Sequence, residues 1–225
     1  MEIKPIAHIR TEFPTKFGIP RQSGLIDSLE AKIIFTPEYR DKNALRGIDE
    51  FSHLWLIWHF SESDSNRWSP TVRPPRLGGN KRVGVFATRS PNRPNPIGLS
   101  SVKLLRVEDD VQFGPVLIVS GADMLDGTPI FDIKPYIPLS DIHTDAVGGF
   151  SDDKKGYCLD VILPNNLADK LPKEKLGTIV EILKSDPRPA YHNSPERIYG
   201  FRFADYEIKF SVENNTLTVV NIEKI

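Results

Sequence analysis

Short apolar runs interrupted by glycine and proline constrain the fold of this 225-residue chain more than any other feature. Up to about Leu163 several runs alternate apolar with polar residues, which is typical of β-strands. Only Pro37–Gly47 has a more helical pattern. No strand–helix–strand alternation recurs, which disfavours a doubly wound parallel sheet and favours a β-barrel or sandwich. The predicted strands are Ile3–Ile9, Leu29–Phe35, Phe51–Phe60, Val83–Ala87, Leu99–Val107, Val116–Ser120, Ile130–Tyr136 and Cys158–Leu163.

The composition changes after residue 163. A helical stretch is predicted over 164–184, and the proline-containing segment 185–189 ends it. A hairpin with the turn 213–215 follows. Its two predicted strands are Gly200–Val212 and Leu217–Ile222. The sequence therefore predicts a mainly β protein, with a non-Rossmann β-barrel domain over residues 1–163 and a small α+β domain over residues 164–225.

The distribution of charge is more informative than the net charge of −1. Between Ser65 and Val107 there are nine Lys or Arg residues and no Asp or Glu. One basic stretch in an otherwise acidic chain favours contact with a polyanion such as RNA. A solvated loop of chance composition is the alternative.

Targeting signals and metal motifs are missing from the sequence. The apolar run Leu54–Phe60 is too short to cross a bilayer, and the first residues lack a signal-peptide pattern. The single cysteine, Cys158, cannot form an internal disulfide, and the five histidines have no zinc-ligand spacing. We therefore expect a cytoplasmic protein that contacts no membrane and holds no metal.

The segment Arg89–Ser100 is the most unusual in the chain. Its prolines at 91, 94 and 96 fix φ and remove backbone donors, which makes the loop stiff and extended. Stiffness lowers the entropy that is lost when a ligand binds. The loop presents the polar side chains of Arg89, Ser90, Asn92, Arg93 and Asn95. We interpret it as a ligand-binding loop, with a proline-rich connector as the alternative.

Two further segments carry polar residues at turns. In the segment 123–136, Asp126 lies on a tight turn at a strand start and can accept hydrogen bonds from a ligand. Asp132 and Lys134 share one face of the following strand, where a surface ion pair is the preferred interpretation. In the segment 185–191, Arg188 can grip a phosphate and Tyr191 can stack on a base. A turn that joins two domains explains that last segment equally well.

Several of these segments together resemble the TsaA-like family. The matching segments are Pro20–Gln22, Leu45–Trp55, Arg89–Ser100 and Leu125–Tyr136, in the order found in the family, and Asp186–Tyr191 resembles a motif of its longer bacterial members. The characterised bacterial members are tRNA N6-threonylcarbamoyladenosine methyltransferases that act at position 37, 3′ to the anticodon. The resemblance implies an S-adenosylmethionine-dependent tRNA (adenine-N6)-methyltransferase that modifies threonine tRNA. It also implies a homodimer with cofactor sites near the subunit interface.

The resemblance also implies which residues touch the cofactor. Carried over residue by residue, they are Pro20, Arg21, Gln22, Ser61, Glu62, Arg89, Leu99, Asp126, Gly127, Thr128 and Pro129. One departure concerns the strand that ends near Phe60, because the family often has a histidine just after that aromatic. Here the position reads Ser61 and Glu62, while His59 precedes the aromatic. Either that side chain is not needed, or His59 replaces it from another direction.

The expected reaction needs a base, because the N6 nitrogen of the substrate is a poor nucleophile until it loses its proton. The candidates are Asp126, His59 and Tyr136. Arg93, Arg188 and Tyr191 are the candidate RNA contacts, and Arg89 and Arg93 are candidates to orient a carboxylate or phosphate. Two alternatives remain open: a barrel methyltransferase for another RNA or a small molecule, and a non-catalytic RNA-binding module.

Overall fold

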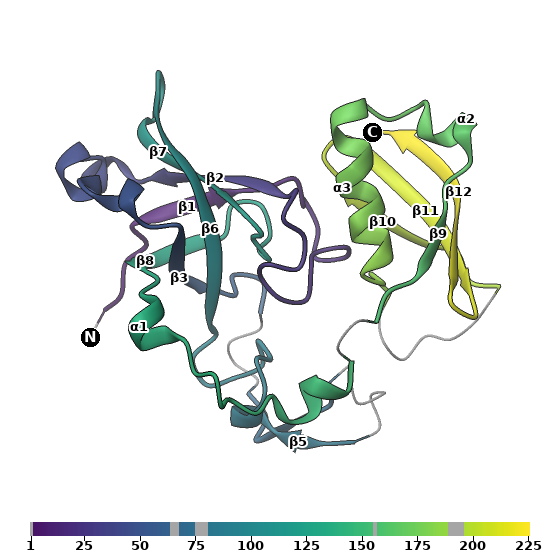
Figure 1. The fold of residues 1–225 in the computed structure, drawn as a ribbon, viewed down its shortest axis with the longest axis horizontal. Coiled ribbons are helices and arrows are strands. Elements are labelled where there is room, and N and C mark those ends of the chain that lie inside the picture. The colour runs from purple at the N-terminus through teal and green to yellow at the C-terminus, as the bar shows by residue number, and fades with distance from the viewer. Residues whose placement is uncertain (1, 64–67, 75–80, 155–156, 189–195) are drawn as a thin grey trace.

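A computed structural model describes residues 2–63, 68–74, 81–154, 157–188 and 196–225. Two β-rich units lie side by side (Figure 1), a closed barrel formed by the first part of the chain and a four-stranded sheet formed by the last part. The prediction of a mainly β protein with a barrel and a small α+β unit is confirmed.

The barrel strands follow one another in the order β1-β2-β7-β6-β3-β8, and every neighbouring pair is antiparallel. Antiparallel neighbours need only short connections, which agrees with the short runs and turns of the sequence. The bounds of these strands are Ala7–Arg10 (β1), Glu30–Phe35 (β2), His53–His59 (β3), Ile97–Asp110 (β6), Gly114–Ser120 (β7) and Pro129–Pro135 (β8).

Strand β3 shows why the barrel closes around an apolar core. Its residues alternate in burial, so that Leu54, Leu56 and Trp58 point inward while His53 and His59 lie on the outer side. The inward residues join a buried cluster that draws on all of the barrel strands. On the outer face of β8, Lys134 pairs with Asp132 at 2.9 Å, which confirms the predicted surface ion pair.

Two predicted elements of the first part are shorter than expected. The segment Pro37–Gly47, predicted to be helical, forms only short 3₁₀ turns with i→i+3 hydrogen bonds. Pro37 begins the first turn, and the side chain of Asp41 caps the second, so no continuous α-helix forms. The predicted strand Val83–Ala87 is a strand for only two residues, since its partner is equally short. The elements are η1 (Pro37–Tyr39), η2 (Lys42–Leu45), η3 (Ile48–Glu50), β4 (Thr71–Val72), β5 (Val83–Gly84) and η5 (Val85–Ala87).

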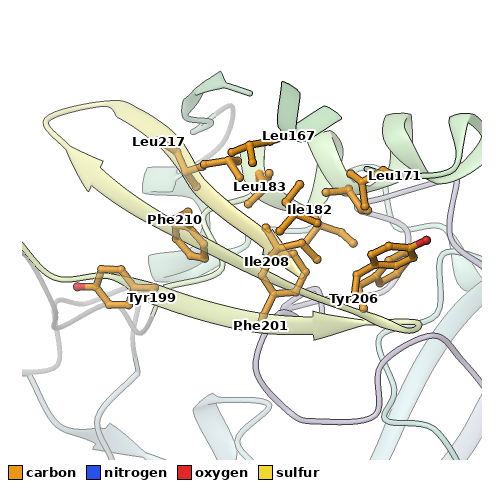
Figure 2. Packing of buried hydrophobic residues seen from close by; sticks show 14 of the residues in the cluster. Leu167, Leu171, Ile182, Leu183, Tyr199, Phe201, Tyr206, Ile208, Phe210 and Leu217 are labelled. Carbon is orange, nitrogen blue, oxygen red and sulfur yellow. The ribbon is translucent and has the colours of Figure 1, made fainter. Parts of the chain in front are cut away.

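The last part of the chain forms a sheet in the order β10-β11-β12-β9, covered by helices. Figure 2 shows leucine and isoleucine side chains of the helical segment packed against aromatic side chains of the strands, among them Phe201 and Phe210. The elements are β9 (Asp160–Ile162), α2 (Asn165–Ala168), α3 (Lys173–Lys184), β10 (Tyr199–Phe203), β11 (Tyr206–Glu213) and β12 (Thr216–Lys224).

The predicted single strand Gly200–Val212 is wrong. The chain turns at Ala204 and Asp205, so that β10 and β11 form a hairpin of their own. Ala204 takes a φ of 49°, which a non-glycine residue rarely adopts, and its N–H donates to the Glu12 carbonyl at 2.8 Å. A long-range bond therefore helps to hold a turn that lacks glycine and proline and whose single turn-type residue is Asp205.

The two units pack on one another through the loop that follows β1. Phe13 lies in the core of the C-terminal unit, where its ring meets Phe203 at a centroid distance of 5.3 Å. Ile26 and Leu29 join the same core. Strand β9, which lies before residue 163, pairs in parallel with β12 of this unit. Segments from the first part of the chain thus contribute to the core of the second.

Gly18 is a tight point of this packing, and we expect Gly18→Ala to lower the free energy of unfolding by about 2–3 kcal/mol. Its φ is +97°, and an added Cβ would lie 2.6 Å from Cδ2 of Phe201. Gly24 is the matched control, since its φ is +73° but nothing lies within 4 Å of an added Cβ. Chemical denaturation should show a loss of only about 1 kcal/mol for Gly24→Ala. Equal losses for the two variants would contradict the packing argument.

Two short elements, α1 (Pro138–Asp141) and η6 (Gly149–Lys154), lie on the connection between the units. No helix within the ranges that the structure describes is long and apolar enough to cross a membrane.

Candidate functional site

A cavity of about 670 Å³ opens at one end of the barrel, a size that suits a small-molecule ligand. Four segments that are far apart in the sequence line it. They are the loop after β1 (residues 16–22), the end of β3 with the turn that follows it (58–63), the proline-rich loop with the start of β6 (88–99), and the connection from β7 to β8 (123–128).

Most of the site residues predicted from the sequence meet in this cavity. Those that line it are Pro20, Arg21, Gln22, His59, Ser61, Glu62, Arg89, Arg93, Leu99 and Thr128. Both His59 and the Ser61–Glu62 pair are present, so the departure from the family pattern falls on the wall of the site itself.

Asp126, Gly127 and Pro129 do not line the cavity. The Asp126 carboxylate accepts from Nε of Arg10 at 2.8 Å and from the Thr11 backbone N–H at 2.9 Å. Gly127 donates its N–H to the Ile9 carbonyl, and Pro129 begins β8 opposite His8. These bonds hold the β7–β8 connection against β1, and their roles toward a cofactor stay predictions.

Three other candidates lie elsewhere or outside the described residues. Tyr136 lies beyond the far end of β8, with its ring 5.4 Å from that of Trp55. The side chain of Arg188 is only 10% exposed, in an ion pair with Asp186. Tyr191 lies outside the residues that the structure describes.

The proline-rich loop is braced by its own polar groups. Nη1 of Arg93 donates to the carbonyls of Thr88, at 3.1 Å, and Ser90, at 3.4 Å. Nη1 of Arg89 donates to Oε1 of Gln22 at 2.6 Å and so joins this loop to the opposite segment of the wall. Arg93 therefore shapes the loop, while Arg89 links two walls of the cavity.

A hydrogen-bonded chain lies beneath these walls, and the sequence analysis did not identify it. The indole N–H of Trp58 donates to Oγ of Ser100 at 2.9 Å, and that hydroxyl donates to Oδ1 of Asp123 at 2.6 Å. Burial raises the pKa of Asp123, although the bond from Ser100 and the charge of Arg89 oppose that rise. Asp123 is thus a partly buried acid on the cavity wall, within electrostatic range of Arg89.

A weak signal for this chain is present in the sequence. Ser100 occupies an inward position of an apolar strand, and Asp123 comes three residues after the buried strand β7. Both side chains interrupt a pattern that predicts apolar residues. A polar residue at such a position usually needs a buried partner, so the two could have been paired as a hypothesis.

The basic stretch of the sequence serves several purposes in the structure. Arg89 and Arg93 line the cavity, whereas Arg106 pairs with Glu108 and Glu30 on the outside of the barrel. Nε of Arg82 donates to Oγ1 of Thr71. Within the described residues, no group of His, Cys, Asp and Glu side chains is arranged to hold a metal ion.

The cavity fits a ligand that combines an amino-acid group with an apolar or aromatic part. A partly buried carboxylate near a guanidinium suits an ammonium and a carboxylate on one molecule. Apolar side chains on the wall include Ile19, Trp58, Leu99 and Leu125. S-Adenosylmethionine has these parts, and no parallel nucleotide-binding sheet is present in the described chain to bind it in the Rossmann manner.

The fold and the cavity define a β-barrel enzyme of the non-Rossmann type. The chain belongs to the tRNA-methyltransferase O family: residues 8–142 match the tRNA-methyltransferase O N-terminal domain, and residues 158–225 match the TrmO C-terminal domain. The predicted membership is therefore confirmed, since the TsaA-like and tRNA-methyltransferase O names describe one family.

Individual relatives agree with this membership. The tRNA (adenine(37)-N6)-methyltransferase of Escherichia coli (strain K12) is 37% identical over 234 residues, covering 99% of this chain and 97% of that protein. A Pseudomonas aeruginosa protein, "Putative S-adenosylmethionine-dependent methyltransferase RcsF", is 38% identical and covers 92% of this chain and 90% of that one. A crystal structure of TrmO from Pseudomonas aeruginosa superposes with a TM-score of 0.77 at 31% identity, over 99% of this chain and 98% of that one.

These matches bear out the predictions of enzyme class and cofactor. The chain is a tRNA (adenine-N6)-methyltransferase, and S-adenosylmethionine is its cofactor.

Proposed function

We propose that the protein methylates N6 of N6-threonylcarbamoyladenosine at position 37 of threonine tRNA. The cavity at the barrel end carries this proposal, because it combines the partly buried carboxylate of Asp123, Arg89 and a stiff loop in the region that matches the family. The names of relatives support adenine 37 as the target. The threonylcarbamoyl group and the threonine tRNA rest on the resemblance of the sequence alone.

We place the cofactor in this cavity. Asp123 would hold its ammonium group, and Arg21 and Arg89 are the candidates for its carboxylate. When bound, S-adenosylmethionine supplies a methyl group on a sulfonium, which is already a good leaving group. The protein mainly has to align the attacking nitrogen and exclude water from it. The Trp58–Ser100–Asp123 chain fixes one wall of the cavity for that purpose.

His59 is our first candidate to accept the N6 proton. Of the three bases proposed from the sequence, it alone lines the cavity. The carboxylate of Asp126 is bonded to Arg10 and Thr11, and Tyr136 lies against Trp55 at the far end of β8. A general base needs hydrogen-bond reach to the proton that it takes, directly or through one water.

We propose that the anticodon loop lies over the mouth of the cavity and the β4–β5 hairpin. Exposed aromatic and basic side chains occur in and next to this hairpin: Trp68 is 52% exposed, Phe86 is 77% exposed, and Lys81 is exposed as well. Aromatic rings can stack on the unpaired bases of a loop, while basic groups meet its phosphates. Arg93, Arg188 and Tyr191 stay candidates for RNA contact.

We also propose a homodimer formed through exposed apolar side chains of β6, a strand that begins at the cavity. Ile97, Leu99, Leu105 and Val107 on this strand are all between 36% and 52% exposed. A row of exposed apolar side chains on one strand is typical of a surface that meets a partner. Sedimentation of the purified protein should give the mass of two chains, and Leu105→Asp together with Val107→Asp should reduce it to one.

The substrate is tested by adding the purified protein and labelled S-adenosylmethionine to two preparations of threonine tRNA. One carries the threonylcarbamoyl group at adenine 37, and the other is an unmodified transcript. We expect methyl transfer to the modified tRNA only, with nucleoside mass spectrometry locating the methyl on N6. Equal transfer to both would contradict the requirement for that group. No transfer to either would favour another RNA or a small molecule, and no transfer with intact RNA binding would favour a binding module.

A further inference from the structure

Two residues of the segment that follows α3 join a tyrosine that precedes β9 in a cluster of polar side chains, which we call the clasp (Tyr157, Asp186 and Arg188). The guanidinium of Arg188 donates to both carboxylate oxygens of Asp186, through Nε at 2.8 Å and Nη2 at 2.9 Å. The Tyr157 hydroxyl donates to Oδ2 of the same carboxylate at 3.0 Å. The side chains of Asp186 and Arg188 are each only 10% exposed.

The clasp fixes a backbone conformation that is otherwise unfavourable. Asp186 has a φ of 55°, in the left-handed region. Its carboxylate also accepts from the backbone N–H of Arg188 at 3.3 Å, so the side chain holds its own turn. Burial raises the pKa of Asp186, but the bonds from Arg188 and Tyr157 outweigh burial and leave that pKa lowered, so the ion pair is formed at neutral pH.

The backbone of the clasp reaches the wall of the cavity. Nη2 of Arg21 donates to the carbonyl of Asp186 at 3.1 Å and to the carbonyl of Arg188 at 2.8 Å. Arg21 lines the cavity, and the adjacent Gln22 accepts the bond from Arg89. A continuous set of bonds therefore runs from the C-terminal unit to two arginines of the barrel site.

We propose that Asp186 and Arg188 are positioning residues, which hold the turn whose carbonyls orient Arg21 for the cofactor. In this proposal Arg188 supports the cofactor pocket through Arg21, without touching the cofactor, and does not bind an RNA phosphate. Its guanidinium is already paired with a carboxylate through Nε and Nη2 and is only 10% exposed, unlike the exposed groups that usually meet a nucleic acid. The inference rests on the proposed placement of the cofactor in the cavity.

Calorimetric titration with S-adenosylmethionine in the absence of tRNA tests this role. Arg188→Lys keeps the charge but cannot form the two parallel bonds, so we expect the dissociation constant for the cofactor to rise about fivefold. Tyr157→Phe removes the hydroxyl that donates to Asp186 and should raise the dissociation constant about twofold, and that variant decides the question if Arg188→Lys fails to fold.

Lys175→Met is the matched control. Lys175 of α3 pairs with Glu12 of the loop after β1, so it also joins the two units, but it does not line the cavity. If loosened packing between the units were the cause, Lys175→Met would weaken cofactor binding as much as Arg188→Lys does, provided that both variants lose the same amount of melting temperature. We expect its dissociation constant to stay at the wild-type value.

Arg89→Ala is titrated in parallel to separate two failures. If Arg89→Ala weakens cofactor binding while Arg188→Lys and Tyr157→Phe do not, the positioning role is overturned. The placement of the cofactor in the cavity then stands. A weaker tRNA affinity of Arg188→Lys, with its cofactor affinity intact, would identify a direct RNA contact instead. If Arg89→Ala also leaves the cofactor affinity unchanged, the cofactor lies elsewhere and both proposals fall. None of these readouts depends on which nucleoside is methylated.

Discussion

Asp123→Asn will weaken S-adenosylmethionine binding by at least about tenfold while leaving the free energy of unfolding at neutral pH unchanged or higher. A hydrogen bond to a charged group contributes about 1.5–3 kcal/mol, which is the amount that binding loses when the carboxylate becomes an amide. Folding loses little, because the ionised carboxylate is desolvated in the protein and the Asn carbonyl can still accept from Ser100. Calorimetry and chemical denaturation measure the two effects separately.

The pH dependence of the free energy of unfolding tests the role of Asp123 by a second, independent measurement. Because burial raises the pKa of Asp123 above its ordinary value of 3.8, the folded protein binds more protons than the unfolded chain between those two pKa values. The stabilisation is fully present below the unfolded pKa and is lost as the pH rises through the folded pKa. The free energy of unfolding of the wild type minus that of Asp123→Asn should therefore fall as the pH rises across this window.

Asp110 provides the control of opposite sign. Backbone hydrogen bonds from Gln112 and Phe113 and the bond from Lys32 hold the pKa of Asp110 below its ordinary value. Its contribution is present above the unfolded pKa and is lost as the pH falls through the folded pKa. The free energy of unfolding of the wild type minus that of Asp110→Asn should therefore rise with pH. Cofactor binding by Asp110→Asn should equal that of the wild type. If Asp126→Asn weakens cofactor binding and Asp123→Asn does not, Asp126 is the cofactor contact, as the sequence predicted.

Local patterns predicted the barrel well because each strand carries its own signal. The alternation in β3 follows from one buried face, and it can be recognised without knowing the partner strands. The turn at Ala204 could not be predicted in this way, because a bond to Glu12 from the other end of the chain helps to hold it. Elements defined by near neighbours were recovered, whereas an element that depends on a distant contact was not.

The same distinction explains the two acids of the β7–β8 connection. Asp123 and Asp126 lie three residues apart, and the sequence favours Asp126 because of the turn signal at the following glycine. Which of them faces the cavity depends on Arg10, which engages Asp126 from 116 residues away, and on Ser100, which engages Asp123. Partners at such distances in the sequence leave no periodic trace.

Arg188 illustrates a limit of the resemblance as well. A family motif indicates which residues are important. It does not show whether Arg188 binds RNA or forms an ion pair with Asp186, two positions earlier in the sequence. The buried ion pair settles where this side chain lies and leaves its effect on the cofactor to the titrations above.

Gly98→Ala should lower the free energy of unfolding by about 2 kcal/mol and weaken cofactor binding by at least about tenfold. An added Cβ would lie 2.2 Å from Cε2 of Trp58 and within 2.6 Å of two further ring atoms. The indole is 6% exposed and bonded to Ser100, so it cannot move without breaking the chain that ends at Asp123. Thermal unfolding and calorimetric titration of the same preparation measure both losses.

Gly84→Ala is the control, because nothing lies within 4 Å of an added Cβ at that strand residue. A double-mutant cycle with Trp58→Phe isolates the cause, since the smaller ring lacks the benzo part of the indole, which carries the overlapping Cζ2. In the Trp58→Phe background the loss of stability caused by Gly98→Ala should fall by at least half. If the loss is the same in both backgrounds, the overlap with the indole is not what makes glycine necessary at this position. The cavity wall would then depend on the backbone of β6 rather than on the packing of Trp58.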